Sequence, residues 1–124
     1  MQYQRLVPHA QAPTPTQYGY DIFSAEGYAI MPGDRVVVST GIKVQLPQGW
    51  YGVLQNKTGI TIKHGVTVTG TAEPGYDGEL KVVIFNQDRK NTFVIRPGYR
   101  VAHLVLQPFG PPLPPVCTET APDN

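Results

Sequence analysis

Side chains able to do chemistry concentrate in a few short segments that also contain glycine. Glu73 and Asp21 offer carboxylates with basic oxygens. Lys57 offers a point charge that could meet a phosphate, the Thr58 hydroxyl can donate a hydrogen bond, and the Gly59 amide can approach an oxygen closely. The same three residues also suit a turn that ends a strand and leaves the lysine in water, so both interpretations stay open.

Other site chemistries find little support. His9, His64 and His103 lack the spacing of a metal site. Cys117 is the one cysteine, so a disulfide within the chain and a cysteine metal cage are excluded, and a reducing compartment is the natural expectation. The formal net charge of +1 gives no reason to expect nucleic acid or an anionic membrane as a partner.

The elements that must position these residues are short strands. The chain holds 13 Gly and 13 Pro, which separate short apolar runs in the manner of many tight turns. Val36-Val37-Val38 is interpreted as a fully buried strand, and residues 42–46 alternate as a strand with one buried face. No window shows helical periodicity, and Ile60-Thr61-Ile62 is too β-branched to predict a helix. We therefore expect an all-β fold, either a jelly roll or a β-sandwich.

Turn residues also predict local features. Glu73-Pro74-Gly75-Tyr76-Asp77-Gly78 has the composition of a hairpin tip, and a strand follows from Leu80 to Phe85. Residues 29–36 and 94–101 repeat one pattern, an apolar pair, a Pro-Gly turn, and an arginine that leads into a strand. We interpret this repeat as one hairpin device used twice.

The two ends of the chain differ from its middle. Residues 8–19 predict an irregular lead-in, and residues 110–124 a proline-rich tail outside a domain of residues 1–109. The run from Pro111 to Pro115 is either a solvated tail or a ligand for a proline-recognising domain. We expect no secretory signal and no membrane span, hence an intracellular protein, cytoplasmic or nuclear.

Four segments resemble the motifs of the trimeric dUTP pyrophosphatase (dUTPase) family in order and spacing. The resemblance as a whole runs from about Arg5 to Phe109, and four motifs in register make a specific match, whereas one motif alone would be weak. The third segment resembles the uracil-binding hairpin of the family. The four segments are residues 18–25, 56–59, 70–80 and 98–104.

The resemblance implies a fold, a reaction and an assembly. The family has a jelly-roll fold of the β-clip type and cleaves dUTP to dUMP and pyrophosphate, with Mg²⁺ bridging the triphosphate oxygens. The hairpin that begins at Gly70 pairs with the uracil edge, and a tyrosine at the position of Tyr76 packs on the deoxyribose. Each site is shared between subunits of a homotrimer, so dUTP and two further copies of the chain are the implied partners.

The resemblance also assigns roles, each with a plainer alternative. Glu73 stands where the family has the aspartate that holds the attacking water, and is either a weakened general base or an ordinary exposed carboxylate. Tyr76 either packs on the sugar or holds its own turn. Asp21 either orients the waters of the metal or caps a turn. His103 replaces the usual glutamine beside the phosphates, a position where a lone histidine is more often structural.

The departures predict weak or absent turnover. Glu73 carries one methylene more than aspartate, which moves its carboxylate by roughly a bond length. The family also has a C-terminal arm rich in arginine and glycine that closes the site, and nothing after Phe109 resembles it.

Several hypotheses therefore stay open. The protein is a divergent dUTPase with impaired catalysis, or a pseudoenzyme, possible among viral members, that keeps the fold as a protein-interaction module. A purely structural trimeric building block is a further alternative. A deaminase of the related dCTP branch fits less well, because the catalytic residues of that branch find no match here.

Overall fold

The computed structural model of the protein describes residues 1–111 and 116–122. Across these residues the chain forms twelve short strands and one helix. They are β1 (Gln2–Arg5), β2 (Thr14–Pro15), β3 (Gly19–Phe23), β4 (Tyr28–Ile30), β5 (Arg35–Ser39), β6 (Ile42–Gln45), β7 (Trp50–Gln55), α1 (Thr58–His64), β8 (Val66–Thr69), β9 (Thr71–Ala72), β10 (Lys81–Asn86), β11 (Phe93–Ile95) and β12 (Arg100–Pro108).

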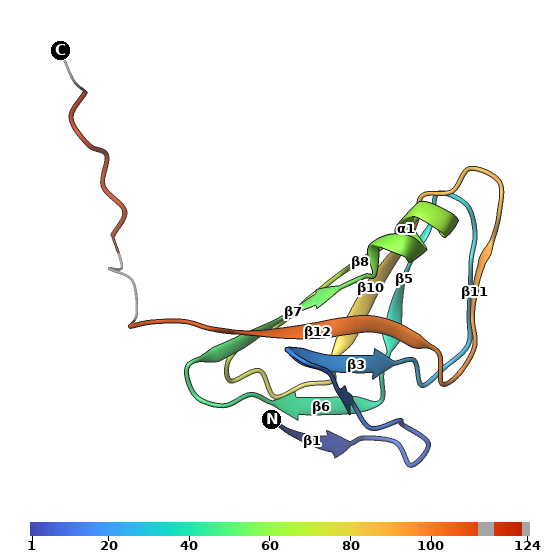
Figure 1. Ribbon diagram of the computed structural model, residues 1–124, viewed down its shortest axis with the longest axis horizontal. Helices are drawn as coiled ribbons and strands as arrows, with labels where there is room; N and C mark the ends of the chain where they lie inside the picture. Colours follow the sequence, from blue (N-terminus) through green and yellow to red (C-terminus); the bar gives the residue numbers. More distant parts are fainter. Residues whose placement is uncertain (112–115, 123–124) are drawn as a thin grey trace.

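The strands pair into small antiparallel sheets, and the largest has the order β2-β3-β12-β7-β9. A second sheet has the order β5-β10-β8, and β1-β6 and β11-β4 are two-stranded. Figure 1 shows β12 as the long strand that crosses the molecule, with β3 and β7 along it. The all-β prediction is confirmed, and most connections are turns that need no helical crossover.

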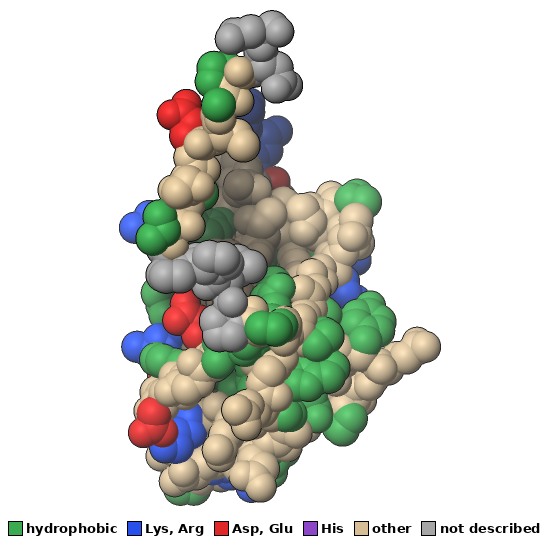
Figure 2. Space-filling model, turned by 90° about the vertical axis from the view of Figure 1, so that its left-hand side faces the viewer, with side chains coloured by type: hydrophobic (Ala, Val, Ile, Leu, Met, Phe, Trp, Pro, Cys, Tyr) green, Lys and Arg blue, Asp and Glu red, His purple; other side chains and the backbone are tan. Residues whose placement is uncertain are grey.

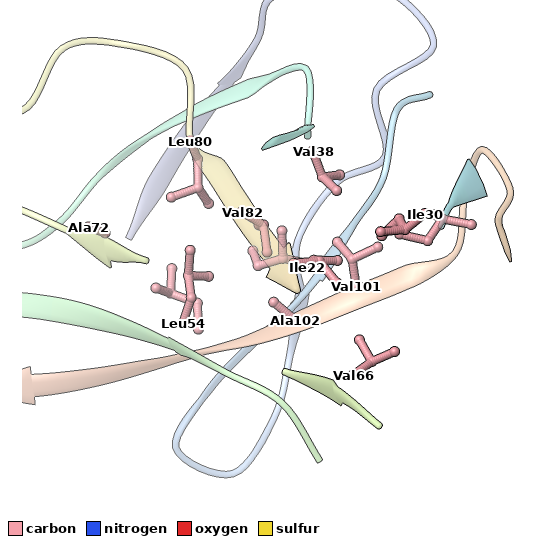
Figure 3. Packing of buried hydrophobic residues seen from close by; sticks show 13 residues of the cluster. Ile22, Ile30, Val38, Leu54, Val66, Ala72, Leu80, Val82, Val101 and Ala102 are labelled. Carbon is pink, nitrogen blue, oxygen red and sulfur yellow. The ribbon is translucent and has the colours of Figure 1, made fainter. Parts of the chain in front are cut away.

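One buried cluster joins the sheets. Figure 3 shows side chains from several sheets converging on one interior, among them Ile22 of β3, Val82 of β10 and Leu54 of β7. Each of these is at most 3% exposed, and burying such a side chain contributes about 1.5–3 kcal/mol. The run at 36–38 departs from its predicted burial, because Val38 is buried while Val37 is 52% exposed. The strand alternates like its neighbours, with one face in the core and one in solvent.

The predicted Pro-Gly turn is present at both places in the chain. Gly33 and Gly98 have φ values of 79° and 87°, and each follows a proline in a turn closed by a backbone hydrogen bond of 3.0 Å. This is the type II pattern, which requires a positive φ at its third residue. The strands before the two turns, β4 and β11, pair with each other, with Ala29 opposite Val94.

The prediction that the chain holds no helix is wrong at α1. Lys57 is the N-cap residue, and Gly65 ends the helix in the left-handed conformation with φ of 67°. The Asn56 amide donates to Thr61 Oγ1 at 3.1 Å and to the Val66 carbonyl at 2.8 Å, which ties the helix to β8. The helix penalty of a β-branched residue is only about 0.5 kcal/mol, so these tertiary bonds outweigh it.

The N-terminal end of the chain contains more regular structure than predicted, and the described part of the tail contains none. β1 pairs with β6, and Thr14–Pro15 of the expected irregular lead-in forms β2 beside β3. Residues 116–122 have no regular structure and are exposed. The predicted proline-rich ligand lies, apart from Pro111, outside the described residues. No helix in the described part of the chain is long and apolar enough to cross a membrane.

Candidate nucleotide site

The predicted hairpin is present and consists of β8 and β10. Towards its tip the chain leaves this pairing, and β9 joins the sheet of β7 instead. β8 and β10 pair antiparallel, with Thr69 opposite Val83. Gly70 then redirects the chain, so that β9 pairs with β7 and leaves residues 73–79 as an open loop. Gly70 has a φ of 151°, and a Cβ atom there would lie 2.6 Å from Leu54 Cδ1. Only glycine suits this kink, because both its backbone conformation and its surroundings exclude a side chain.

Tyr76 projects from the loop with one face free. Its hydroxyl donates a 3.1 Å hydrogen bond to the Glu79 carbonyl, and its amide donates to the Glu73 carbonyl at 3.2 Å. The ring lies so close over Gly78 that a Cβ atom at that position would overlap its hydroxyl end. The side chain is still 53% exposed. The ring therefore has a fixed position and a surface on which a ligand could pack.

A cleft of about 500 Å³ opens beside this ring. Glu73, Gly75, Tyr76 and Asp77 form one wall, and residues 2–4 of β1 and 43–46 from β6 onward form the other. Glu73 is exposed at this cleft. A pocket of this size suits a small molecule such as a nucleotide.

A second cleft lies on the other side of the loop. It measures about 450 Å³ and is lined by Leu46, Pro47, Pro74 and Phe109 among others. Figure 2 shows the side of the molecule from which the tail departs, and hydrophobic side chains gather on it. The loop thus stands between a polar cleft and a more apolar one.

A second polar group lies around β12. Asp21 of β3 is the cross-strand neighbour of His103, and its carboxylate lies 3.6 Å from Arg100 Nη1. His103 Nε2 lies 2.7 Å from Thr16 Oγ1, and the ring of Tyr18 meets the imidazole edge-on at 5.2 Å. These contacts hold the imidazole from two sides.

The first turn of α1 completes this second group. Lys57, Thr58 and Gly59 are exposed there, and no side chain caps the helix. Lys57 lines a small cavity together with Arg100 and His103. The first amides of a helix have no carbonyl partner within it, so they can receive an anion beside the lysine. The structure therefore brings Lys57 and His103 to one cavity, with Asp21 opposite His103 on the neighbouring strand.

Sequence reasoning missed Arg100 as a site residue. It is the one cation in the segment 98–104, and its guanidinium can bind phosphate oxygens in pairs where Lys57 cannot. The available signal was its place in the segment 98–104, three residues before His103 on the same strand.

The two groups stay apart within one chain. His103 pairs with Gln55 of β7, whereas Ala72, next to Glu73, pairs with Gly52. Gly52 and Gln55 are three residues apart on β7, which is about 10 Å at the rise of a strand. Glu73 and Tyr76, here called the base-side group, line one cleft. Lys57, Arg100 and His103 line another and, with Asp21 beside them, are here called the phosphate-side group.

One ion pair marks the loop tip. Lys43 Nζ donates a 2.6 Å hydrogen bond to Asp77 Oδ1. This bond, together with the charge of the lysine, lowers the pKa of the Asp77 carboxyl below its usual range. The cleft wall therefore carries a paired carboxylate at Asp77 beside Glu73.

Fold and site together define a small antiparallel β-protein with a divided polar site. A sequence model of the dUTPase family matches residues 7–122, so the chain belongs to the dUTPase family. Deoxyuridine 5′-triphosphate nucleotidohydrolase of Nocardia farcinica is 38% identical over 110 residues, covering 84% of this chain and 67% of the relative. The protein of the same name from Mus musculus is 36% identical over 111 residues, with 86% and 68% covered. Across such relatives, the chain spans between 60% and 68% of their length.

Solved structures place the fold among dUTPases of bacteriophages. A mutant dUTPase from phage phi11 of S. aureus superimposes with a TM-score of 0.86 at 27% identity, covering 96% of this chain and 97% of that one. That structure is described as coordinating a structural Mg(II) ion. The dUTPase of Staphylococcus bacteriophage 80alpha gives 0.85 at 26% identity, with 98% and 97% covered. The predicted family and fold are confirmed.

Proposed function

We propose that the protein hydrolyses dUTP to dUMP and pyrophosphate at a low rate. The observation that carries this proposal is the open cleft beside the exposed Tyr76 ring, in the loop that begins at Gly70. Relatives named deoxyuridine 5′-triphosphate nucleotidohydrolase support the substrate. In this proposal the backbone of the loop pairs with the uracil edge, and the Tyr76 ring packs on the deoxyribose and excludes a 2′-hydroxyl.

Glu73 is the proposed base that holds the attacking water. It is exposed at the cleft, which leaves room for water beside its carboxylate. Its extra methylene relative to aspartate displaces the carboxylate, and a misplacement near 1 Å can cost about 100-fold in rate. The low rate follows from this displacement.

The phosphate-side group is the proposed anion site. Lys57, Arg100 and His103 line one small cavity, and Thr58 and Gly59 beside it offer a hydroxyl and backbone amides. Phosphoryl transfer depends on positioning and charge neutralisation, which cations and amides at this place would supply. Asp21 would hold Arg100 in position and orient metal-bound water.

The residues fit a magnesium ion that arrives with the substrate. In the described part of the chain no three His, Cys, Asp or Glu side chains gather closely enough to hold a metal by themselves. Mg²⁺ usually keeps several waters and binds through one or two carboxylates plus substrate phosphates, a role open to Asp21. When bound, it would neutralise charge on the triphosphate oxygens.

The divided site supports a homotrimer. The positions on β7 that pair beside the two groups are three residues, or about 10 Å, apart, and the two groups line different clefts of this chain. A neighbouring copy would bring its phosphate-side group to the cleft beside Tyr76. Cyclic assemblies repeat such a contact between identical subunits.

Pyrophosphate release from dUTP with Mg²⁺ tests this function. We expect slow release that is abolished in Glu73→Ala, with no release from dTTP, whose methyl group the base pocket has to exclude. Release that is equal for dUTP and dTTP, or unchanged in Glu73→Ala, contradicts the proposal.

A non-catalytic role is the second candidate, and Glu73 in the place of an aspartate favours it. The 80alpha dUTPase is described among phage dUTPases that control transfer of virulence genes, which gives a precedent for regulation by this fold. Here residues 1–109 would be the scaffold and residues 110–124, which contain no Arg or Lys, the segment for a proline-recognising domain. A viral origin and a pseudoenzyme belong to this alternative. Binding of dUTP without any turnover would favour it.

A further inference from the structure

Glu79 ties the Tyr76 loop to the body of the domain. Its Oε2 atom accepts a 2.5 Å hydrogen bond from the Ser39 hydroxyl and a 2.9 Å bond from the Gly41 amide. Ser39 is the last residue of β5, and Gly41 lies in the turn between β5 and β6. Hydrogen bonds to a charged carboxylate are about twice as strong as neutral ones, and Glu79 is half-buried, so water competes little.

The turn that receives Glu79 is itself rigid. Gly41 has a φ of 70°, and a Cβ atom there would lie 2.6 Å from Val7 Cγ2 and 2.9 Å from Ala10 Cβ. This close packing leaves the turn little freedom to move. Glu79 therefore joins the loop to a fixed point.

The same residue also holds the Tyr76 ring. Its carbonyl oxygen accepts the Tyr76 hydroxyl at 3.1 Å, with the ring folded over the intervening Gly78. Between residues 73–79 and the rest of the described chain, the other side-chain hydrogen bond is the Lys43–Asp77 pair. The Asp77 side chain is 85% exposed, and an exposed pair of this kind contributes little.

We propose that Glu79 is a positioning residue that sets the place of the Tyr76 ring and, through it, the preference for 2′-deoxyribose over ribose. The inference rests on the proposed contact between Tyr76 and the sugar. Leu80 stays attached through its amide, which donates to the Ile42 carbonyl at 2.8 Å, and through its carbonyl, which accepts from the Thr40 hydroxyl. Without the carboxylate, residues 73–79 keep this attachment at their C-terminal end but lose the side-chain bonds to Ser39 and Gly41, so the Glu79 carbonyl that supports the Tyr76 ring gains freedom to move. The gap that excludes a 2′-hydroxyl then widens.

Three variants of the full chain test this role. Glu79→Ala removes the acceptor, whereas Glu79→Gln keeps an oxygen that can accept from Ser39 and Gly41. Glu26→Ala is the control, since the Glu26 carboxylate pairs with His9 at 3.3 Å and makes no hydrogen bond to residues 73–79. For each variant, amide hydrogen exchange of residues 73–78 is measured without nucleotide. Calorimetry then gives the Kd values of the α,β-imido analogues of dUTP and UTP.

We expect Glu79→Ala to change both loop exchange and sugar preference, and Glu79→Gln and Glu26→Ala to resemble the wild type. Exchange in residues 73–78 accelerates, and the preference for the deoxy analogue falls at least about tenfold, because an ångström-scale displacement can cost up to 100-fold. For Glu79→Gln and Glu26→Ala, the ratio of the two Kd values should stay within about a factor of two of the wild-type ratio. A loss of stability alone would leave the ratio of the two Kd values unchanged in the folded protein.

Two outcomes overturn the inference in distinguishable ways. If the wild type binds neither analogue, the proposed function fails and the assignment to the sugar fails with it. If the wild type prefers the deoxy analogue but Glu79→Ala keeps that preference, or if exchange of the loop does not change, the positioning role alone is wrong.

Discussion

Arg100 Nη1 lies 3.6 Å from Asp21 Oδ1, and this pair connects β12 to β3 beside His103. The two side chains are 30% and 22% exposed, so they are partly shielded from water. The pair holds the guanidinium at the cavity that it shares with Lys57.

Asp21→Asn and Arg100→Gln should therefore have coupled effects. Each is expected to lower kcat/KM for dUTP, and the double variant should lose little more than the stronger single one, because both act through one contact. Stability should change by no more than about 1 kcal/mol. A double-mutant cycle on kcat/KM measures the coupling, and fully additive losses would show that the two residues act separately.

Glu73→Asp should increase the rate of dUTP hydrolysis. Shortening the side chain removes the methylene that displaces the carboxylate, and the gain is expected to be about 10- to 100-fold in kcat. Glu73→Gln should be inactive, since an amide is no base at neutral pH. Both variants should melt at the wild-type temperature, because Glu73 is exposed. A lower kcat in Glu73→Asp would show that the surrounding loop has adapted to glutamate.

Gly70→Ala should destabilise the fold. The new methyl group would meet Leu54 Cδ1 at 2.6 Å and the Lys81 carbonyl at 3.3 Å, at a φ of 151°. Strain and overpacking of this kind cost about 1–3 kcal/mol. Urea unfolding measures the loss, with Gly110→Ala as the control, since a Cβ atom at Gly110 has nothing within 4 Å. Equal stability of the two variants would show that the kink does not require glycine at position 70.

Stability should decrease in acid through two carboxylates. A hydrogen bond from the Asn91 amide lowers the pKa of Asp88, and Lys43 lowers that of Asp77. Because both pKa values are lower in the folded chain, the stabilisation is complete above the ordinary pKa of about 4 and is lost as the pH falls below it. Unfolding free energies between about pH 5 and pH 2.5 should show this slope. Asp88→Asn should flatten it, whereas Glu119→Gln in the tail should not.

Removal of magnesium should affect activity and not folding. EDTA is expected to abolish pyrophosphate release, since the triphosphate then lacks its neutralising cation. The melting temperature should stay the same, because the described residues hold no cluster of three metal-binding side chains. A lower melting temperature in EDTA would reveal a structural metal site, as described for the phi11 enzyme.

The sequence predicts the parts of this fold that depend on local chemistry. The Pro-Gly turns at Gly33 and Gly98 require glycine for a reason that the preceding proline reveals, whereas the kink at Gly70 depends on its contact with Leu54. Four motifs in register likewise predict the family, which is confirmed, and they indicate the candidate site residues.

The rest depends on tertiary contacts. The helix α1 forms because Asn56 bonds across it to Thr61 and Val66, and no propensity of residues 60–62 indicates this. The sequence does not indicate Arg100 as a candidate site residue, because its contact with Asp21 depends on the pairing of β12 with β3. The separation of Glu73 from Lys57 follows from strand register, which a sequence motif does not encode.

Subunit complementation tests most directly whether the base-side and phosphate-side groups meet between copies of the chain. One variant carries Glu73→Ala, and the other carries Lys57→Ala with Arg100→Ala, so each keeps one group intact. Neither should hydrolyse dUTP alone, and the co-expressed mixture should recover part of the wild-type rate. A mixture that stays as inactive as its components, beside an active wild type, would contradict a site shared between subunits.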